Sequence, residues 1–244
     1  MTRYYRDETG MYIDWDQLDK LPDIDTLIDI GVGPMGTPDL HARFDAAKLL
    51  LIDPLDETKS YIDANLESRE VIWHKCGVGK EVDEVIINVE EKIGRSSILN
   101  VADINYEGDP VDKRKISIKT LDNIIASETN LGRLGIKIDT EGYELNIILG
   151  ATETLKTTEF VLAEVRHNHE SFEGVYKLHE FVSAMQDNDF ILSMIITAKP
   201  FIADLCFQKR SSLQWVCNLL LKSEIQGSKV REVYVLIRVT GILK

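Results

Sequence analysis

Short apolar runs alternate along the chain with segments of helical periodicity, and this alternation constrains the fold more than any other feature. One run, residues 49–52, is continuously apolar, as expected for a parallel strand buried on both faces. Such alternation predicts an α/β fold with a mostly parallel sheet and helices on both faces. The strands are expected at residues 26–30, 49–52, 71–74, 134–139, 160–165, 191–196 and 205–208.

The segment after the first strand carries helix signals over residues 38–48. Thr37 suits an N-cap, and Pro38 suits the first helical position. Further helices are expected at residues 57–67 and 178–185. Two more are expected, one directly after the strand at 134–139 and one at a short segment that Thr120 caps.

Residues 80–119 break the alternation, because strand-like runs at 85–89 and 116–118 are separated by polar loops. We expect one domain over residues 1–210, with a short N-terminal lead-in and an insertion at about 80–119. The extension 211–244, with a helix at 213–221 and a strand at 233–239, is expected to pack on the domain or to form a homo-oligomer interface.

Composition limits the partners. The hydrophobic fraction of 44% is enough for a core. A net charge of −13 disfavours nucleic acid and anionic membranes. The three cysteines lack metal-ligand spacing, the N-terminus lacks an apolar signal region, and no apolar run reaches the ~20 residues of a membrane span. These observations predict a cytoplasmic protein with free thiols.

A glycine-rich loop follows the first strand and reads Asp29-Ile30-Gly31-Val32-Gly33-Pro34-Met35-Gly36. It matches the G-x-G-x-x-G pattern of dinucleotide sites, and Asp53 lies where a ribose-binding acid is expected. An NAD(P)-dependent oxidoreductase that uses this loop is therefore one interpretation.

Two details favour a different ligand. Thr37 and Pro38 delay the helix, whereas a pyrophosphate site needs the helix to begin at the glycines. Asp29 is also poorly suited to a pyrophosphate, but it suits the ammonium and sulfonium groups of S-adenosylmethionine. We therefore predict a methyl-donor site, with Asp53 accepting hydrogen bonds from the ribose. Its residues are Asp29, Gly31, Val32, Gly33, Asp53, Pro54, Gly77 and Val78.

The fourth strand delivers Asp139 and Glu141 at its carboxyl end, where ligands bind in open α/β sheets. Glu144 lies in the first turn of the following helix, where negative charge is favourable. Lys137 is expected to be buried and therefore to need a carboxylate partner, either Asp139 or Glu164.

The segment Ile136-Lys137-Ile138-Asp139-Thr140-Glu141-Gly142-Tyr143-Glu144, followed by Leu149-Gly150-Ala151, resembles the hallmark of FkbM-family methyltransferases. Ser96-Ser97, Lys119-Thr120-Leu121-Asp122 and Leu162-Ala163-Glu164-Val165 fall in the order of that family, and the blocks around Asp29 and Asp53 are similar to its cofactor block. The resemblance covers about residues 27–208. Pro34 and Asp53 depart from the commoner pattern, and the tail beyond Ser211 has no counterpart.

This resemblance implies a class I, Rossmann-like methyltransferase fold with a seven-stranded sheet. It also implies S-adenosylmethionine-dependent methyl transfer to oxygen, with a hydroxyl of a sugar, glycan or small natural product as the acceptor. Such an acceptor must lose a proton as the bond forms. Asp139 is our first candidate for the base and Glu141 the second. Asp139 has an equally supported alternative role in binding the donor's ammonium group.

Three further residues are assigned to the acceptor. Ser97 lies in the insertion, and His167 and His169 follow the strand that carries Glu164. A divalent metal held by Asp139, Glu141 and His169 is another interpretation. Their spacing does not favour it, and we expect no metal.

Overall fold

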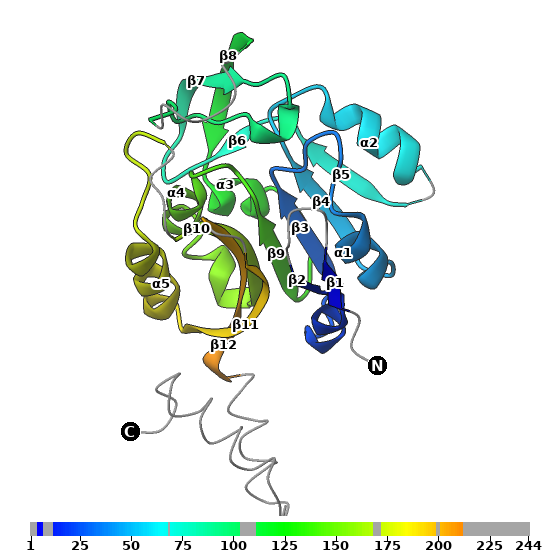
Figure 1. Cartoon of the computed structure of the whole chain (residues 1–244). Helices are drawn as coiled ribbons and strands as arrows, with labels where there is room; N and C mark the ends of the chain where they lie inside the picture. Colours follow the sequence, from blue (N-terminus) through cyan, green and yellow to red (C-terminus); the bar gives the residue numbers. More distant parts are fainter. Residues whose placement is uncertain are drawn as a thin grey trace, which may run out of the picture.

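The structure is a computed structural model that describes residues 4–6, 12–67, 69–102, 111–167, 172–198 and 201–211 (Figure 1). Side chains are described from Gln17 onward, apart from that of Ala198. The predicted helix at 213–221, the strand at 233–239 and the oligomer interface assigned to the extension lie outside the described residues.

The main sheet has nine strands in the order β1-β2-β11-β12-β10-β9-β3-β4-β5. Strands β5, β4, β3, β9 and β10 are parallel, and β12 runs antiparallel between β10 and β11. These seven strands form the predicted mostly parallel sheet of a class I methyltransferase. The hairpin of β1 (Tyr4–Arg6) and β2 (Tyr12–Asp14) extends it beyond β11. The seven are β3 (Thr26–Ile30), β4 (Lys48–Ile52), β5 (Val71–His74), β9 (Leu134–Ile138), β10 (Thr158–Arg166), β11 (Phe190–Ala198) and β12 (Ile202–Lys209).

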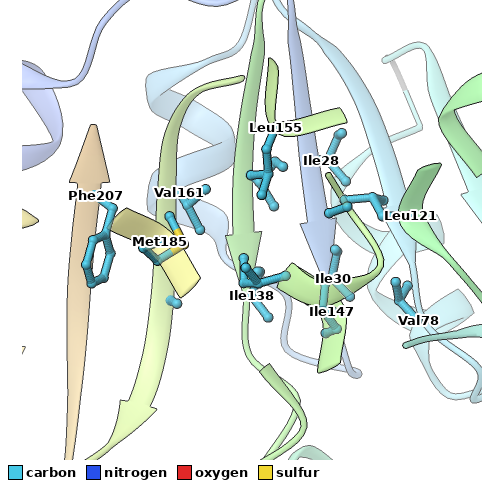
Figure 2. Close-up of a cluster of buried hydrophobic side chains, with 14 of the residues drawn as sticks. Ile28, Ile30, Val78, Leu121, Ile138, Ile147, Leu155, Val161, Met185 and Phe207 are labelled. Carbon is cyan, nitrogen blue, oxygen red and sulfur yellow. The ribbon is translucent and has the colours of Figure 1, made fainter. Parts of the chain in front are cut away.

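Helices cover both faces of the sheet, as the alternation predicts (Figure 1). Alternate residues of each strand point to opposite faces. Ile28 and Leu50 therefore join one buried cluster with α3, α4 and α5, whereas Leu27 and Leu49 join another with η1, α1 and α2. Figure 2 shows part of the first cluster. The helices are η1 (Trp15–Lys20), α1 (Pro38–Arg43), α2 (Thr58–Asn65), α3 (Leu121–Ala126), α4 (Glu144–Leu149), η3 (Thr154–Thr157) and α5 (Leu178–Asp187).

Helix α1 is shorter than the predicted segment 38–48. Arg69, from beyond α2, donates hydrogen bonds to the carbonyl oxygens of His41 (2.8 Å), Phe44 and Ala47 (2.9 Å). These bonds satisfy carbonyl groups that helix termination leaves without partners. Thr37 precedes the helix but makes no side-chain cap, whereas Thr120 caps α3 as predicted.

The insertion, together with the short strand just before it, forms a second sheet in the order β6-β8-β7, beside the carboxyl edge of the main sheet (Figure 1). Its strands are β6 (Gly77–Val78), β7 (Asp83–Val89) and β8 (Asp112–Lys119), and η2 (Ile93–Arg95) follows β7. Both strands predicted in this segment are present and longer than expected. Ile87, Val89, Ile116 and Ile118 pack with Leu55, which fixes this sheet to the loop after β4.

Candidate active site

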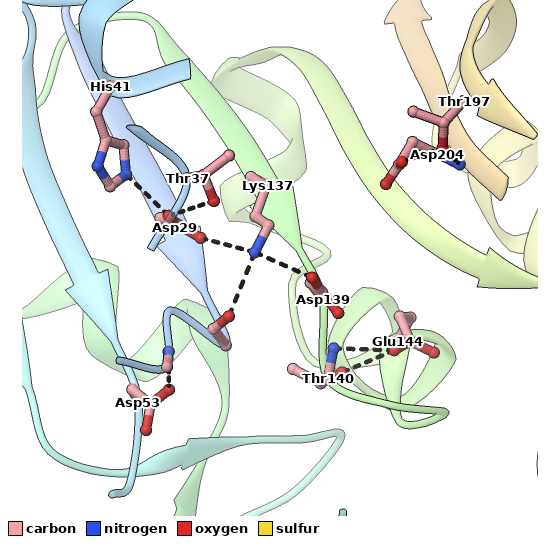
Figure 3. Close-up of polar contacts among 12 residues, drawn as sticks. Asp29, Thr37, His41, Asp53, Lys137, Asp139, Thr140, Glu144, Thr197 and Asp204 are labelled. Carbon is pink, nitrogen blue, oxygen red and sulfur yellow. Dashed lines mark hydrogen bonds and ion pairs between the residues drawn. The ribbon is translucent and has the colours of Figure 1, made fainter. Parts of the chain in front are cut away.

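The glycine loop after β3 packs against the end of β9. Gly31 has a φ of +79°, and a Cβ there would lie 1.8 Å from the carbonyl oxygen of Asp139. Any side chain at this position would therefore separate the two strand ends. The Gly33 backbone N–H donates to Asp53 Oδ2 at 2.9 Å, which ties the loop to the end of β4 (Figure 3).

The loop ends at Gly36, which has a φ of +59° and lies against the ring of Tyr61. A Cβ at Gly36 would come within 2.1 Å of that ring. The Tyr61 hydroxyl is 2.7 Å from His41 Nδ1, and His41 Nε2 is 2.8 Å from Asp29 Oδ2. A buried hydrogen-bonded chain therefore runs from α2 through α1 to β3.

Asp29 and Lys137 are directly opposite in the β3–β9 register. Lys137 Nζ lies 3.3 Å from Asp29 Oδ1, 3.5 Å from Asp139 Oδ2 and 3.3 Å from the Gly31 carbonyl oxygen (Figure 3). Asp29 is fully buried, and Thr37 also donates to its Oδ2. Of the two partners expected for Lys137, Asp139 is correct. Its pairing with Asp29 was not foreseen from the sequence.

Electrostatics keep this cluster charged. Burial opposes the ionised form of Asp29, but Lys137 and His41 outweigh it, so the pKa of Asp29 lies below its ordinary value. Burial likewise opposes the charge on Lys137, yet Asp29 and Asp139 raise the pKa of its ammonium group. The pair therefore stays ionised around neutral pH.

Asp53 is 5% exposed and contacts the glycine loop on the side that faces the end of β4. Its Oδ1 accepts from the Leu55 N–H at 2.8 Å, while its Oδ2 accepts from Gly33. Burial raises the pKa of this carboxyl group. Each carboxylate oxygen can accept a second hydrogen bond, so Asp53 keeps the capacity to receive two hydroxyl donors.

Glu141 lies just beyond β9 with a φ of +55°, which is unusual for a residue with a side chain. Burial, followed by the charge of Asp139, raises its pKa to about 7, although Arg166 opposes the shift. Arg166, at the end of β10, hydrogen-bonds to Glu141 Oε2. The Ser97 hydroxyl donates to the Glu141 carbonyl oxygen at 2.8 Å, which links the insertion to this turn.

Glu144 stabilises the same turn through hydrogen bonds to its backbone and to Thr140. Its Oε1 accepts from the Thr140 N–H (3.0 Å), the Thr140 hydroxyl (3.1 Å) and the Gly142 N–H (3.0 Å). The side chain is 1% exposed, so this glutamate is structural, in agreement with its expected place at a helix N-terminus.

A cavity of about 290 Å³ lies beyond the carboxyl ends of these strands. That volume is close to the lower end of typical ligand pockets, about 300–1,000 Å³. The cavity is lined by both predicted catalytic residues and most of the predicted donor-site residues: Gly31, Val32, Gly33, Asp53, Pro54, Gly77, Val78, Asp139 and Glu141. Asp29 is not in its lining, so the structure gives Asp29 contact with the site through Lys137.

Several wall residues were not identified from the sequence. The insertion contributes Ile93, Gly94, Ser96 and Ile98, whereas Ser97 was the residue of this segment that the sequence assigned to the site. Leu55, Cys76 and Tyr143 also line the cavity. Their one common signal in the sequence is position, because each lies within a few residues after the end of a strand, β4, β5 or β9.

The predicted acceptor residues do not share one place. Ser97 is buried and supports Glu141, and its neighbour Ser96 lines the cavity. His167 is exposed outside the cavity lining, and its backbone N–H donates to Phe201. His169 lies outside the described residues, so the ligand set that includes it has no structural description.

Asp139, Glu141 and Glu164 each place a carboxylate oxygen within 4.8 Å of the others, an arrangement that could hold a cation. Arg166 already supplies positive charge to Glu141. Acidic groups gathered at a strand edge do not by themselves define a metal site.

Comparison with known proteins defines the class. The methyltransferase FkbM domain model matches residues 36–192. The chain therefore belongs to the FkbM methyltransferase family, which is S-adenosylmethionine-dependent. This membership favours methyl transfer over the dinucleotide alternative. No curated protein matches the chain.

Solved structures with a similar course of the chain are remote. An O-methyltransferase family protein from Burkholderia thailandensis has a TM-score of 0.47 at 10% identity, over 80% of this chain and 55% of that protein. A putative S-adenosylmethionine-dependent methyltransferase from Listeria monocytogenes has a TM-score of 0.43 at 12% identity, over 80% of this chain and 97% of that protein. This chain thus spans about half the length of the first of them.

The site residues fit the donor that the family implies. Gly31 and Gly33 allow the backbone to approach a ligand closely, and Asp53 can accept from both ribose hydroxyls. The charges of Lys137 and Asp139 at the cavity wall, together with that of Asp29 directly behind Lys137, sum to a net negative value. This sign complements a donor whose sulfonium and ammonium groups outnumber its one carboxylate.

None of the helices in the described part of the chain is long and apolar enough to cross a membrane.

Proposed function

We propose that the chain transfers a methyl group from S-adenosylmethionine to a hydroxyl of a sugar, a glycan or a small natural product. The observation that carries this proposal is Glu141, a carboxyl group on the wall of the donor cavity with a pKa of about 7. A base whose pKa is near the working pH is the group that hydroxyl methylation needs.

Donor binding and proton removal are carried out by different residues of the cavity. The Gly31–Gly33 segment and Asp53 hold the donor, which when bound supplies a methyl group already activated by its sulfonium. Glu141 accepts the proton of the acceptor hydroxyl as the new oxygen–carbon bond forms and the sulfur–carbon bond breaks. Arg166 fixes the orientation of the Glu141 carboxylate. Positioning and proton removal are therefore the main contributions of the protein.

This assignment reverses the order expected from the sequence, where Asp139 was the first candidate. Asp139 lies 3.5 Å from the Lys137 ammonium group and its side chain is 35% exposed, so this carboxylate is already paired with a cation. We assign to Asp139 the alternative role, contact with the donor's ammonium group.

The acceptor is proposed to be a small molecule or a carbohydrate, and neither nucleic acid nor a membrane. The net charge of −13 supports this, because it opposes the approach of phosphate-rich partners. A cytoplasmic location remains the expectation from the sequence.

The test is methyl transfer from labelled S-adenosylmethionine to a panel of free sugars, nucleotide-sugars and glycan fragments. The proposal expects a methyl ether in the product and S-adenosylhomocysteine in equal amount. Label on nitrogen or carbon would contradict hydroxyl chemistry, and binding of NAD(P) without binding of S-adenosylhomocysteine would contradict the whole assignment.

A further inference from the structure

The two ends of the glycine loop are held by different parts of the molecule. At the first end, the Gly31 carbonyl oxygen accepts a hydrogen bond from Lys137 Nζ at 3.3 Å. At the second end, Gly36 lies against the ring of Tyr61, where an added Cβ would come within 2.1 Å. Lys137 belongs to β9 and Tyr61 to α2, so the conformation of the loop depends on how these two elements are placed relative to each other.

An unbroken series of polar contacts, the buried chain, joins Tyr61 to Lys137. The Tyr61 hydroxyl is 2.7 Å from His41 Nδ1, and His41 Nε2 is 2.8 Å from Asp29 Oδ2. Asp29 Oδ1 is in turn 3.3 Å from Lys137 Nζ, and Figure 3 shows this part of the series. The four side chains are each no more than 8% exposed and come from four elements, α2, α1, β3 and β9. Since one end of the chain contacts the start of the glycine loop and the other contacts its end, the chain spans the whole loop.

His41 is the central link, because both of its ring nitrogens are used. Asp29 is ionised, and an ionised carboxylate only accepts hydrogen bonds, so the N–H at Nε2 donates to Asp29. The other nitrogen, Nδ1, is then the one that bonds to the Tyr61 hydroxyl. Loss of either contact would leave a buried polar group without its partner, which is costly.

A hydroxyl, an imidazole and a carboxylate in this order also occur in nucleophilic catalysis. Two observations exclude that role for the buried chain. Neither Tyr61 nor His41 is among the described residues that line the donor cavity, and Tyr61 is only 3% exposed. Burial, followed by the charge of Asp29, also raises the pKa of Tyr61 to about 12, which opposes formation of a phenolate. The chain therefore holds other groups in place and does not itself react with a ligand.

We propose that His41 is a positioning residue for the methyl donor: by linking Tyr61 to Asp29 it fixes Lys137, and so holds the two ends of the glycine loop in the geometry that binds the donor. This inference rests on the donor site of the proposed function. Without the contacts of His41, the loop occupies its binding conformation for a smaller fraction of the time, and the apparent affinity for the donor falls by that fraction. His41 thus acts on donor affinity without contact with the donor.

Tyr61→Phe is the sharpest test, because it removes the hydroxyl that meets His41 and keeps the ring that meets Gly36. In calorimetric titration of the full-length protein, this variant should bind S-adenosylhomocysteine about three- to tenfold more weakly, as the loss of one hydrogen bond predicts. His41→Gln keeps a donor for Asp29 but gives up the Tyr61 contact, so it should lose about as much. The double variant should lose less than about twofold more than either single one, because both changes remove the same contact.

NMR of the ligand-free protein gives a second readout that needs no variant to fold. The nitrogen resonances of labelled histidine should show a proton on His41 Nε2, the nitrogen that faces Asp29. In Tyr61→Phe, the backbone amide resonances of Gly31 and Gly36 should both shift or broaden, although the changed atom touches neither end of the loop directly.

Thr26→Val is the matched control. Thr26 begins β3, the strand that carries Asp29 near its other end, and its fully buried hydroxyl donates to the Leu131 carbonyl oxygen at 2.6 Å. This variant also removes one buried hydroxyl hydrogen bond. It should therefore lower the thermal unfolding temperature as Tyr61→Phe does, while its affinity for S-adenosylhomocysteine stays unchanged.

Four results would overturn this inference: equal affinity in Tyr61→Phe and the unaltered protein, additive losses in the double variant, an unprotonated His41 Nε2, or an equal loss of affinity in Thr26→Val. Failure of S-adenosylhomocysteine to bind the unaltered protein would instead overturn the donor site and with it the proposed function. The two failures are therefore distinguishable.

Discussion

Lys137 Nζ lies 3.3 Å from Asp29 Oδ1, across a pair of adjacent parallel strands in the middle of the sheet. The same ammonium group reaches Asp139 and the Gly31 carbonyl oxygen. The pair thus connects the buried interior to both the glycine loop and the cavity wall, so its integrity is expected to govern stability and donor binding together.

Asp29→Asn should lower the free energy of unfolding by about 3–5 kcal/mol, because it leaves the buried Lys137 without its nearest counter-charge. Adding Lys137→Met to it should cost less than the sum of the single changes, with a coupling of about 0.5–3 kcal/mol. Urea denaturation of the four proteins measures this cycle. Additive losses would show that the two side chains do not stabilise each other.

Glu141→Gln should lower the rate of methyl transfer by about 10²–10⁴-fold, since glutamine cannot accept the hydroxyl proton. Asp139→Asn should instead act mainly on the affinity for S-adenosylmethionine. Steady-state kinetics with an acceptor from the labelled-donor panel separates the two effects. A large loss of turnover in Asp139→Asn together with normal turnover in Glu141→Gln would exchange the two roles.

The pKa of Glu141 also predicts a pH dependence of stability. Folding raises it from 4.5 to about 7, so the folded protein holds this proton more tightly than the unfolded chain. The resulting stabilisation is complete below pH 4.5 and is lost as the pH rises to about 7. Relative to Glu141→Gln, the unaltered protein should lose on the order of 3 kcal/mol across this window. Parallel pH curves for the two proteins in urea denaturation would show that Glu141 has an ordinary pKa.

Gly36→Ala should destabilise the protein by about 1–3 kcal/mol or more, because the new Cβ would enter the Tyr61 ring in addition to straining the backbone. Gly174→Ala is the matched control, since Gly174 also has a positive φ, +71°, but a Cβ added there would have nothing within 4 Å. Thermal unfolding compares the two. Equal losses would mean that backbone strain alone, and not contact with Tyr61, requires glycine at position 36.

The fold followed from the sequence because strand and helix signals are local. Residues 49–52 could be recognised as a buried parallel strand from their own composition, and the Gly31–Gly33 turn was visible for the same reason. The end of α1 at Arg43 was not predictable, because it depends on Arg69, which reaches the carbonyl groups of α1 and the residues after it only in the folded chain.

Part of the candidate site could also be predicted from the sequence. Asp53, Asp139 and Glu141 could be placed at the cavity because the carboxyl ends of parallel strands meet at one edge. The pairing of Lys137 with Asp29 could not, since it depends on β3 and β9 being neighbours in a particular register. The tuning of Glu141 depends on burial and on Arg166, which no local pattern around Glu141 reveals.

Calorimetric titration with S-adenosylhomocysteine tests the donor site, the central claim, most directly. The unaltered protein should bind it, and NAD(P) should not compete. Asp53→Ala should weaken binding by about tenfold or more. Loss of the ribose contacts would leave hydroxyl groups of the ligand unsatisfied, at a cost of about 1–3 kcal/mol. Asp56→Ala, an exposed carboxylate three residues away, should leave affinity unchanged. Equal affinity in Asp53→Ala and the unaltered protein, or binding of NAD(P) in place of S-adenosylhomocysteine, would contradict the account.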